Sequence, residues 1–286
     1  MNQFWIAVIA IIVAPIIGGL LAGIDRKITA RLQGRWGPPI IQPFYDLFKL
    51  FGKSRIATSR MQLVWIYGYL VFMITCLVFL VLKLDILLLV FLLGFAGVCF
   101  VLGGFSCKSP YSHFGANREL LQMLSYEPVL LLTALGIYAQ NGSFMISEIF
   151  NRPEPLLASL WPIFIALLVI LTIKLRKSPF DISTSHHAHQ ELVKGIMTEY
   201  SGPYYALIQL TEWYEIVLLL GIIALFWANP LWVGILIALA AFVLELFIDN
   251  IAARMTAGWM VRFSWAIGLV LCILNIAYLY LMKGVS

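Results

Sequence analysis

The chain has 286 residues, of which 62% are hydrophobic and only 12% are charged. Soluble domains carry about 25% charged residues, so this composition excludes a soluble globular protein and is typical of an integral membrane protein. The net charge of +5 lies in the segments between apolar runs and gives no reason to expect a nucleic-acid partner.

Eight apolar runs are each close to the roughly 20 residues that a membrane-spanning helix needs. They cover residues 4–24, 62–82, 86–105, 124–140, 160–175, 204–228, 231–252 and 260–282. The first run lacks the basic flank and cleavage site of a signal peptide, so we expect it to remain a membrane helix. The sequence thus predicts one all-α, multi-pass domain over residues 1–286, with cytoplasmic loops at about 25–61, 106–123, 176–203 and 253–259.

The basic residues predict how these helices are oriented. Sixteen of the nineteen Lys and Arg residues follow odd-numbered spans, and only Lys83, Arg152 and Lys283 follow even-numbered ones or the end of the last span. Because cytoplasmic loops carry an excess of basic residues, we expect both termini outside. We count Lys174, Arg176 and Lys177 among the cytoplasmic loop charges.

The first loop contains a second kind of helix. In the segment 42–53, Asp46, Lys49 and Lys53 recur at helical spacing, with aromatic and leucine residues between them. This pattern predicts an amphipathic helix at the membrane surface. The preceding Gly34–Pro39 contains two glycines and two prolines and holds Arg35 on a bent segment.

Five acids fall within or at the ends of predicted spans: Glu127, Glu212, Glu215, Glu245 and Asp249. An ionised carboxylate at the bilayer centre costs about 2.5–3.5 kcal/mol, so such acids face a cavity, a bundle interior or a partner charge. The spacing of Glu212 with Glu215, and of Glu245 with Asp249, places each pair on one helix face and favours proton transfer. Two alternatives remain: Glu245 and Asp249 could pair with Arg254 or a neighbouring loop, and Glu127 could cap a helix start before Pro128. The sequence shows few basic residues at the depth of Glu212 and Glu215.

The stretch from Arg176 to Gly202 concentrates titratable groups that a membrane protein rarely keeps. It holds His186, His187 and His189 together with the acids Asp181, Glu191 and Glu199. Only His186 and His189 would share a helical face, and no cysteine accompanies them. None of the four cysteines forms a CxxC pair, so we expect no metal or iron–sulfur site in this chain. A role of the histidines in proton delivery or partner docking suits their titration near neutral pH.

These motifs resemble the membrane subunit 1 (H-type) family of complex I. The matching segments occur in order and cover most of the chain: Asp25–Lys27, Ala30–Pro39, Gln42–Lys49, Ser125–Pro128, Ser178–Asp181 and Thr198–Gly202. Two segments, Ile182–Gln190 and Asp249–Met260, depart from the respiratory pattern. They look like the membrane anchor of group 4 energy-converting [NiFe] hydrogenases, of the Ech, Mbh or CO-linked type.

The resemblance implies a subunit that anchors a hydrophilic hydrogenase arm and couples ferredoxin-linked hydrogen evolution to proton or sodium translocation. The [NiFe] centre and [4Fe-4S] clusters would belong to partners, namely the hydrogenase large and small subunits and a ferredoxin-like subunit, with an antiporter-like subunit alongside in the cytoplasmic membrane. Asp181 and Glu199 match acids near the family's quinone cavity or its counterpart, Glu127 and Glu212 match its proton route, and Glu191 matches a glutamate of its loop. Arg26, Arg35, Asp46 and Lys49 match the loop that contacts the arm. Alternatives are a quinone- or sulfur-reducing relative, a free-standing transporter and a purely structural anchor.

Overall fold

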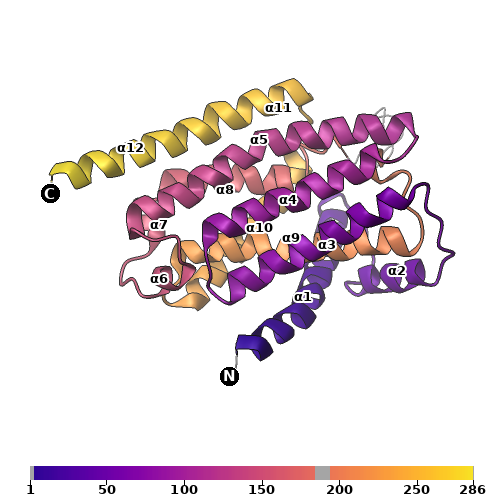
Figure 1. Ribbon diagram of the computed structural model, residues 1–286, viewed down its shortest axis with the longest axis horizontal. Coiled ribbons are helices and arrows are strands. Elements are labelled where there is room, and N and C mark those ends of the chain that lie inside the picture. The colour runs from indigo at the N-terminus through magenta and orange to yellow at the C-terminus, as the bar shows by residue number, and fades with distance from the viewer. Residues whose placement is uncertain (1–2, 184–193, 286) are drawn as a thin grey trace.

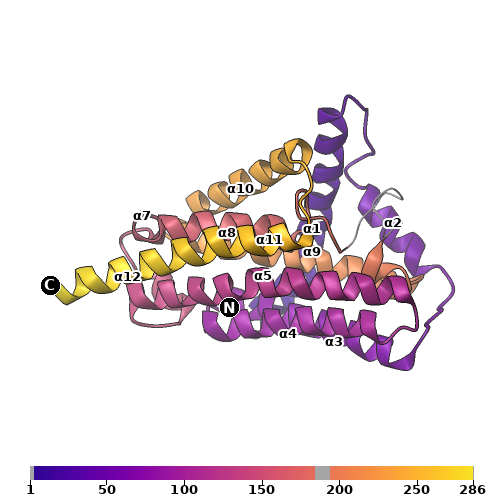
Figure 2. The ribbon, with the colours of Figure 1, turned by 90° about the horizontal axis from the view of Figure 1, so that it is seen from above.

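The computed structural model describes residues 3–183 and 194–285. Within these ranges the chain forms helices joined by short loops, and the only extended pairing is an isolated bridge between Asp85 and Met145. Most of the long helices run side by side, while α1 leans across them (Figures 1 and 2). The all-helical prediction is confirmed.

Seven segments of the described residues are long and apolar enough to cross a membrane. They are α1 (Gln3–Leu32), α3 (Arg60–Val81), α4 (Ile86–Phe105), α5 (Pro110–Asn141), α9 (Pro203–Ala224) with the 3-10 turn η3 (Leu225–Trp227), α10 (Leu231–Ile251), and the last helix, in which α11 (Ala257–Ser264), the π turn η4 (Trp265–Leu269) and α12 (Val270–Val285) are continuous. Each overlaps a predicted span. The placement of both termini outside stays a prediction.

The eighth predicted span is a shorter helix. The small helices α6 (Ile146–Phe150) and α7 (Leu156–Ser159) lead into α8 (Trp161–Lys174), which has 14 residues. At 1.5 Å per residue α8 is about 21 Å long, against a hydrocarbon core of about 30 Å. Helix α8 therefore ends part-way along the bundle. Its last residue, Lys174, is 4% exposed, so its assignment to a cytoplasmic loop was wrong.

The predicted loop at 106–123 is also wrong over most of its length. Helix α5 begins at Pro110, where proline suits the first helical turn because its missing N–H has no helical partner there. The polar residues that suggested a loop, among them Ser112, Glu119 and Gln122, are buried against the rest of the bundle. Polarity along the sequence cannot distinguish a solvated loop from a helix whose polar face lines a protein interior.

The amphipathic helix of the first loop is confirmed as α2 (Gln42–Phe51). Its inner face packs on α9, with Leu47 buried and the rings of Phe44 and Trp213 5.1 Å apart. Its other face exposes Tyr45 and Phe48, which suits a helix lying at a membrane surface. Figure 2 shows α2 outside the main bundle, beside the end of α9.

The chain re-enters the bundle after residue 193 through a short 3-10 turn, η2 (Gly195–Met197), packed on α5. Close backbone approach makes this contact possible. A Cβ at Gly115 would lie 2.1 Å from the nitrogen of Ile196, and one at Gly195 would lie 1.9 Å from the carbonyl oxygen of Ser183. Gly195 also has a φ of +40°, which glycine adopts without a side-chain penalty.

Helices α1 and α9 approach closely at Gly18, and this contact is open to a direct test. A Cβ there would lie 2.3 Å from the carbonyl oxygen of Trp213. We expect Gly18→Ala to lower the free energy of unfolding by about 1–3 kcal/mol through overpacking, measured as a lower melting temperature of the purified complex. Gly258→Ala is the control, because its Cβ would meet nothing within 4 Å. Equal melting temperatures for the two variants would contradict the α1–α9 packing.

Candidate functional site

A group of buried charged side chains lies where α8 ends, half-way along its neighbours. Lys174 donates to the hydroxyl of Tyr126 on α5 at 3.1 Å and forms an ion pair with Glu215 on α9 at 2.8 Å. Tyr69 on α3 donates to the other oxygen of Glu215 at 3.1 Å. Tyr69, Tyr126 and Glu215 all occupy the middle of long membrane helices. Because α8 is short, its last residue, Lys174, places a cation at the centre of the bundle.

Arg176, two residues further on, links two acids from different helices. Its guanidinium bonds both oxygens of Glu119 on α5, with the shortest contact at 2.8 Å, and reaches Glu212 on α9 at 3.1 Å. Phe100 stacks against it, 4.7 Å from ring centroid to guanidinium carbon. Ser183 also donates to Glu119, at 2.5 Å. Arg176 has a φ of +51°, an unfavourable conformation for a residue with a side chain, which the two ion pairs stabilise.

A polar cavity of about 240 Å³ connects these ion pairs. Lys174, Arg176, Glu212 and Glu215 contribute to its wall, together with Asp25 and Arg26 from α1. Lys177 pairs with Asp25 at 2.8 Å, and Arg26 pairs with Asp46 of α2 at 2.7 Å. Each of these two pairs is neutral. The cavity thus runs from the α1–α2 corner to the centre of the bundle.

The central group carries more acid than base. Within the described part of the chain, Glu119, Glu212 and Glu215 form direct ion pairs only with Lys174 and Arg176, so three carboxyls share two directly bound cations. Arg26 lines the same cavity but is itself paired with Asp46. We name Glu119, Glu212, Glu215, Lys174 and Arg176 the central charge cluster. An excess carboxyl beside a polar cavity is the arrangement expected of a group that takes up and releases a proton.

Glu212 and Glu215 were predicted to share a face, and the structure brings both to the cavity. The expectation that few basic residues lie at their depth was wrong. Lys174 and Arg176 are their direct partners, because the chain turns inward after the short α8. The structure thus shows both acids in salt bridges, and their role in proton transfer stays a prediction.

Glu245 and Asp249 on α10 do not pair with Arg254 among the described residues. Glu245 is fully buried and accepts a hydrogen bond from Thr172 of α8 at 3.3 Å. Asp249 accepts from the backbone nitrogen of Ser178 at 2.8 Å, which holds the start of the 175–183 segment against α10. Both acids thus line the same α8–α10 contact, outside the cavity wall.

Arg254 pairs with Asp181 instead, at 2.5 Å. Burial raises the pKa of Asp181 to about 6, although Arg254 acts in the opposite direction, and nearby Asp249 adds to the increase. Asp181 therefore titrates close to neutral pH on a segment that leads directly to Arg176.

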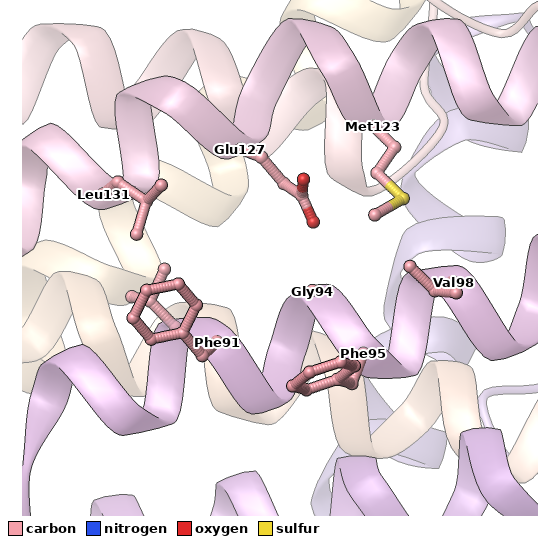
Figure 3. A pocket seen from close by; sticks show the side chains of 8 residues that line it. Phe91, Gly94, Phe95, Val98, Met123, Glu127 and Leu131 are labelled. Atoms are coloured by element: carbon pink, nitrogen blue, oxygen red, sulfur yellow. The ribbon is translucent and has the colours of Figure 1, made fainter.

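Glu127 faces a separate pocket between α4 and α5 (Figure 3). The other side chains around this pocket of about 180 Å³ are apolar, including Phe91, Phe95 and Met123. Gly94 leaves room for the carboxylate, since a Cβ there would lie 2.6 Å from Oε1 of Glu127. No described residue donates a hydrogen bond to this carboxylate. Glu127 is thus apart from the cavity, and it lies within α5 rather than at its start, so the helix-cap alternative is wrong.

The remaining predicted residues lie nearer the surface or outside the described ranges. Glu199 is half-buried near α3, where its backbone carbonyl accepts from Gln62, and does not line the cavity. Arg35 and Lys49 are exposed. Hydrogen bonds from Arg26 and Gln42 outweigh partial burial and hold the pKa of Asp46 below its ordinary value. Glu191, His186, His187 and His189 lie outside the described residues.

Sequence reasoning missed Glu119, Lys174, Arg176, Tyr69 and Tyr126 as site residues. Glu119 was assigned to a loop, and Lys174 and Arg176 were counted as solvated charges. One signal was available in the sequence. The predicted span at 160–175 is short and contains Lys174 near its end, and a helix shorter than its neighbours ends inside the bundle, where its last residues are buried.

Comparison with known proteins identifies the family to which this chain belongs. The family model described as NADH dehydrogenase matches residues 4–280 of this chain. The chain belongs to the NADH dehydrogenase subunit 1 family. This membership confirms the resemblance drawn from the sequence motifs.

Relatives in this family place the chain among subunits of membrane complexes. It is 33% identical to hydrogenase-4 component C of Escherichia coli over 215 residues, which are 68% of this chain and 65% of that protein. Formate hydrogenlyase subunit 4 of the same organism is 29% identical over 91% of this chain and 92% of its own length. A chain of the archaeal membrane-bound sulfane sulfur reductase superposes with a TM-score of 0.88 at 25% identity, covering 98% of this chain and 100% of its own. The chain is thus a multi-pass membrane subunit of a complex I-like hydrogenase or oxidoreductase.

The Lys174–Glu215 pair is open to a double-mutant cycle. We expect Lys174→Met and Glu215→Gln each to destabilise the complex by about 3–5 kcal/mol, because each leaves a buried charge without its partner. The double variant should be more stable than either single variant, measured by thermal unfolding of the purified complex. Additive losses would show that the two side chains are not a coupled buried pair.

Asp181 gives a pH-dependent prediction. Its pKa of about 6 lies above the ordinary 3.8, so the folded protein binds a proton before the unfolded chain does as the pH falls. The carboxyl therefore adds stability as the pH falls through about 6, and this contribution is lost as the pH rises. The melting temperature of the wild type minus that of Asp181→Asn should increase from pH 7 to pH 5. A constant or falling difference would contradict the raised pKa.

Proposed function

We propose that this chain is the membrane subunit of an energy-converting [NiFe] hydrogenase. In this role it anchors the hydrophilic arm and couples ferredoxin-linked proton reduction to the translocation of protons or sodium ions. The [NiFe] centre and [4Fe-4S] clusters belong to the partner subunits. The site of action is the cytoplasmic membrane.

The central charge cluster carries this proposal. Arg176 bonds Glu119 and Glu212 at the same time, and its own segment continues into Ser178 and Asp181, next to the predicted face for the arm. A change in charge or protonation on that face alters the electrostatic force on the Arg176 guanidinium. Any shift of the guanidinium changes which of the two carboxyls keeps its counter-charge, and the less stabilised one takes up a proton. This converts a redox event at the surface into a proton movement at the centre of the bundle.

Further acids extend the path from the cluster. Glu127, in its own pocket on α5, and Glu245 with Asp249 on α10 flank the cluster on two sides. In this proposal they relay charge towards an antiporter-like membrane subunit. Glu191 and Glu199 serve the entry side of the same path.

The docking face for the arm is assigned to the α1–α2 corner and the loop that follows α8. Arg35 and Lys49 are exposed there, and the Arg26–Asp46 pair fixes α2 against the end of α1. His186, His187 and His189 lie outside the described residues, and their part in docking is proposed from the sequence alone. The expected partners are the hydrogenase large and small subunits and a ferredoxin-like iron–sulfur subunit.

The second candidate is a sulfur- or quinone-reducing complex with the same membrane architecture. The superposition on a sulfane sulfur reductase chain favours the sulfur-reducing form. Purification of the complex separates the two candidates. Nickel in stoichiometric amount, with a partner chain that carries paired CxxC motifs, supports the hydrogenase, and their absence supports the alternative.

Replacing Glu212 tests the coupling role. Glu212→Gln removes the carboxyl that shares Arg176 but keeps its shape, so we expect ion translocation per hydrogen evolved to fall by about 10²-fold or more, the scale seen when a positioned proton-transfer group is lost. Translocation is measured with a pH- or sodium-sensitive dye in inverted vesicles, beside hydrogen evolution. The control is Glu154→Gln, an exposed glutamate before α7. Normal pumping by an assembled Glu212→Gln complex would support the structural-anchor alternative.

A further inference from the structure

The last helix contacts α5 at the point where Pro128 interrupts the helical hydrogen bonding of α5. Pro128 has no N–H, so the carbonyl of Leu124, four residues earlier, loses its helical partner. The indole nitrogen of Trp265 donates to that carbonyl oxygen at 3.2 Å. In a membrane an unpaired carbonyl is costly, because no water is present to take the place of the missing donor.

Two more contacts join the same helix turns. Ser264 is buried and donates to the carbonyl of Ser125 at 2.7 Å. Gly268 lets the backbones approach, since a Cβ there would lie 2.8 Å from Val129. Trp265 and Gly268 belong to the π turn η4, whose extra residue changes which side chains face α5. Figure 1 shows this part of the last helix lying along α5.

Glu127 lies on the same turn of α5, between Ser125 and Pro128. Its carboxylate points into the pocket beside Gly94 on α4 (Figure 3). No described residue holds this carboxylate by a hydrogen bond. Its direction therefore depends on the backbone of the 124–128 turn, which Trp265 and Ser264 of the last helix contact.

We propose that Trp265 and Ser264 are positioning residues for Glu127. By binding the carbonyls of Leu124 and Ser125, they hold the backbone of α5 on the turn before Pro128 and keep the Glu127 carboxyl in its apolar pocket. The importance of this position for ion movement rests on the proposed function. The positioning itself is a geometric statement that can be tested without measuring translocation.

Dicyclohexylcarbodiimide is a suitable probe, because it enters apolar pockets and reacts with protonated carboxyls. We would label the intact complex in membranes and follow the Glu127 peptide by mass spectrometry, with Glu127→Gln to confirm the labelled residue. Trp265→Phe keeps a ring but removes the donor, and we expect it to slow labelling of Glu127 by about tenfold, comparable with the loss of a positioning hydrogen bond at other sites. Ser264→Ala should slow it in the same direction with a smaller change in packing.

Trp259→Phe is the matched control. Trp259 lies on α11, is exposed, and its indole makes no hydrogen bond to the described residues. Labelling in this variant should equal that of the wild type. Unchanged or faster labelling in both Trp265→Phe and Ser264→Ala would overturn the proposal.

Positioning and the role of Glu127 in translocation fail in different ways. If Glu127→Gln pumps normally while Trp265→Phe still slows labelling, the positioning holds and the role of Glu127 in translocation fails. If Trp265→Phe and Ser264→Ala both label normally while Glu127→Gln stops pumping, the proton role stands and the positioning fails. Where both hold, the pH profile of translocation should shift in Trp265→Phe and stay unchanged in Trp259→Phe.

Discussion

The ion pairs of Lys174 and Arg176 with the glutamates of α5 and α9 are the interaction on which the rest of this structure depends. Without the two cations, the three carboxyls would have no direct counter-charge inside the bundle and would have to be protonated or remain as unpaired charges. With them, charged groups line a polar cavity of about 240 Å³ at the centre of the bundle. The same residues thus hold the helices together and form the proposed site.

The length of α8 is what makes those pairs possible. A helix of 14 residues ends part-way along its longer neighbours, and the residues that follow it turn into the bundle. The positive φ of Arg176 and the bond from Ser178 to Asp249 guide the chain back along α10. One segment thereby contacts the central glutamates through Arg176 and forms the ion pair between Asp181 and Arg254 a few residues later. The proposed coupling relies on this continuity.

Helix α5 carries a second irregularity. Pro128 removes one helical hydrogen bond, and Trp265 of the last helix donates to the carbonyl of Leu124 that this leaves without its helical partner. Ser264 adds a hydrogen bond to the neighbouring carbonyl of Ser125. Glu127 lies on that turn in a pocket of its own. The end of α8 and the proline of α5 thus both lie beside acids inside the bundle, and in each place other helices provide the hydrogen-bonding or ionic partners.

Particular residues show which features of the structure could be predicted from the sequence and which could not. Apolar periodicity and length located each long helix, the amphipathic α2, and the membrane acids Glu212, Glu215 and Glu127, because hydrophobic burial acts on local runs of residues. Charge counting misassigned Lys174 and Arg176, and local polarity misassigned Glu119 to a loop. These errors share one cause: a charge buried in a pair has the same sequence signature as a charge in water.

The sequence by itself determined that this is an all-helical, multi-pass membrane subunit of the complex I subunit 1 family, since composition, span length and motif order are properties of the chain alone. Tertiary structure decided which cation meets which acid. That choice depends on where α8 stops and how the following segment turns, and both are set by packing between helices far apart in sequence. The partition of Glu127 into one pocket and Glu212 into another follows from the same packing.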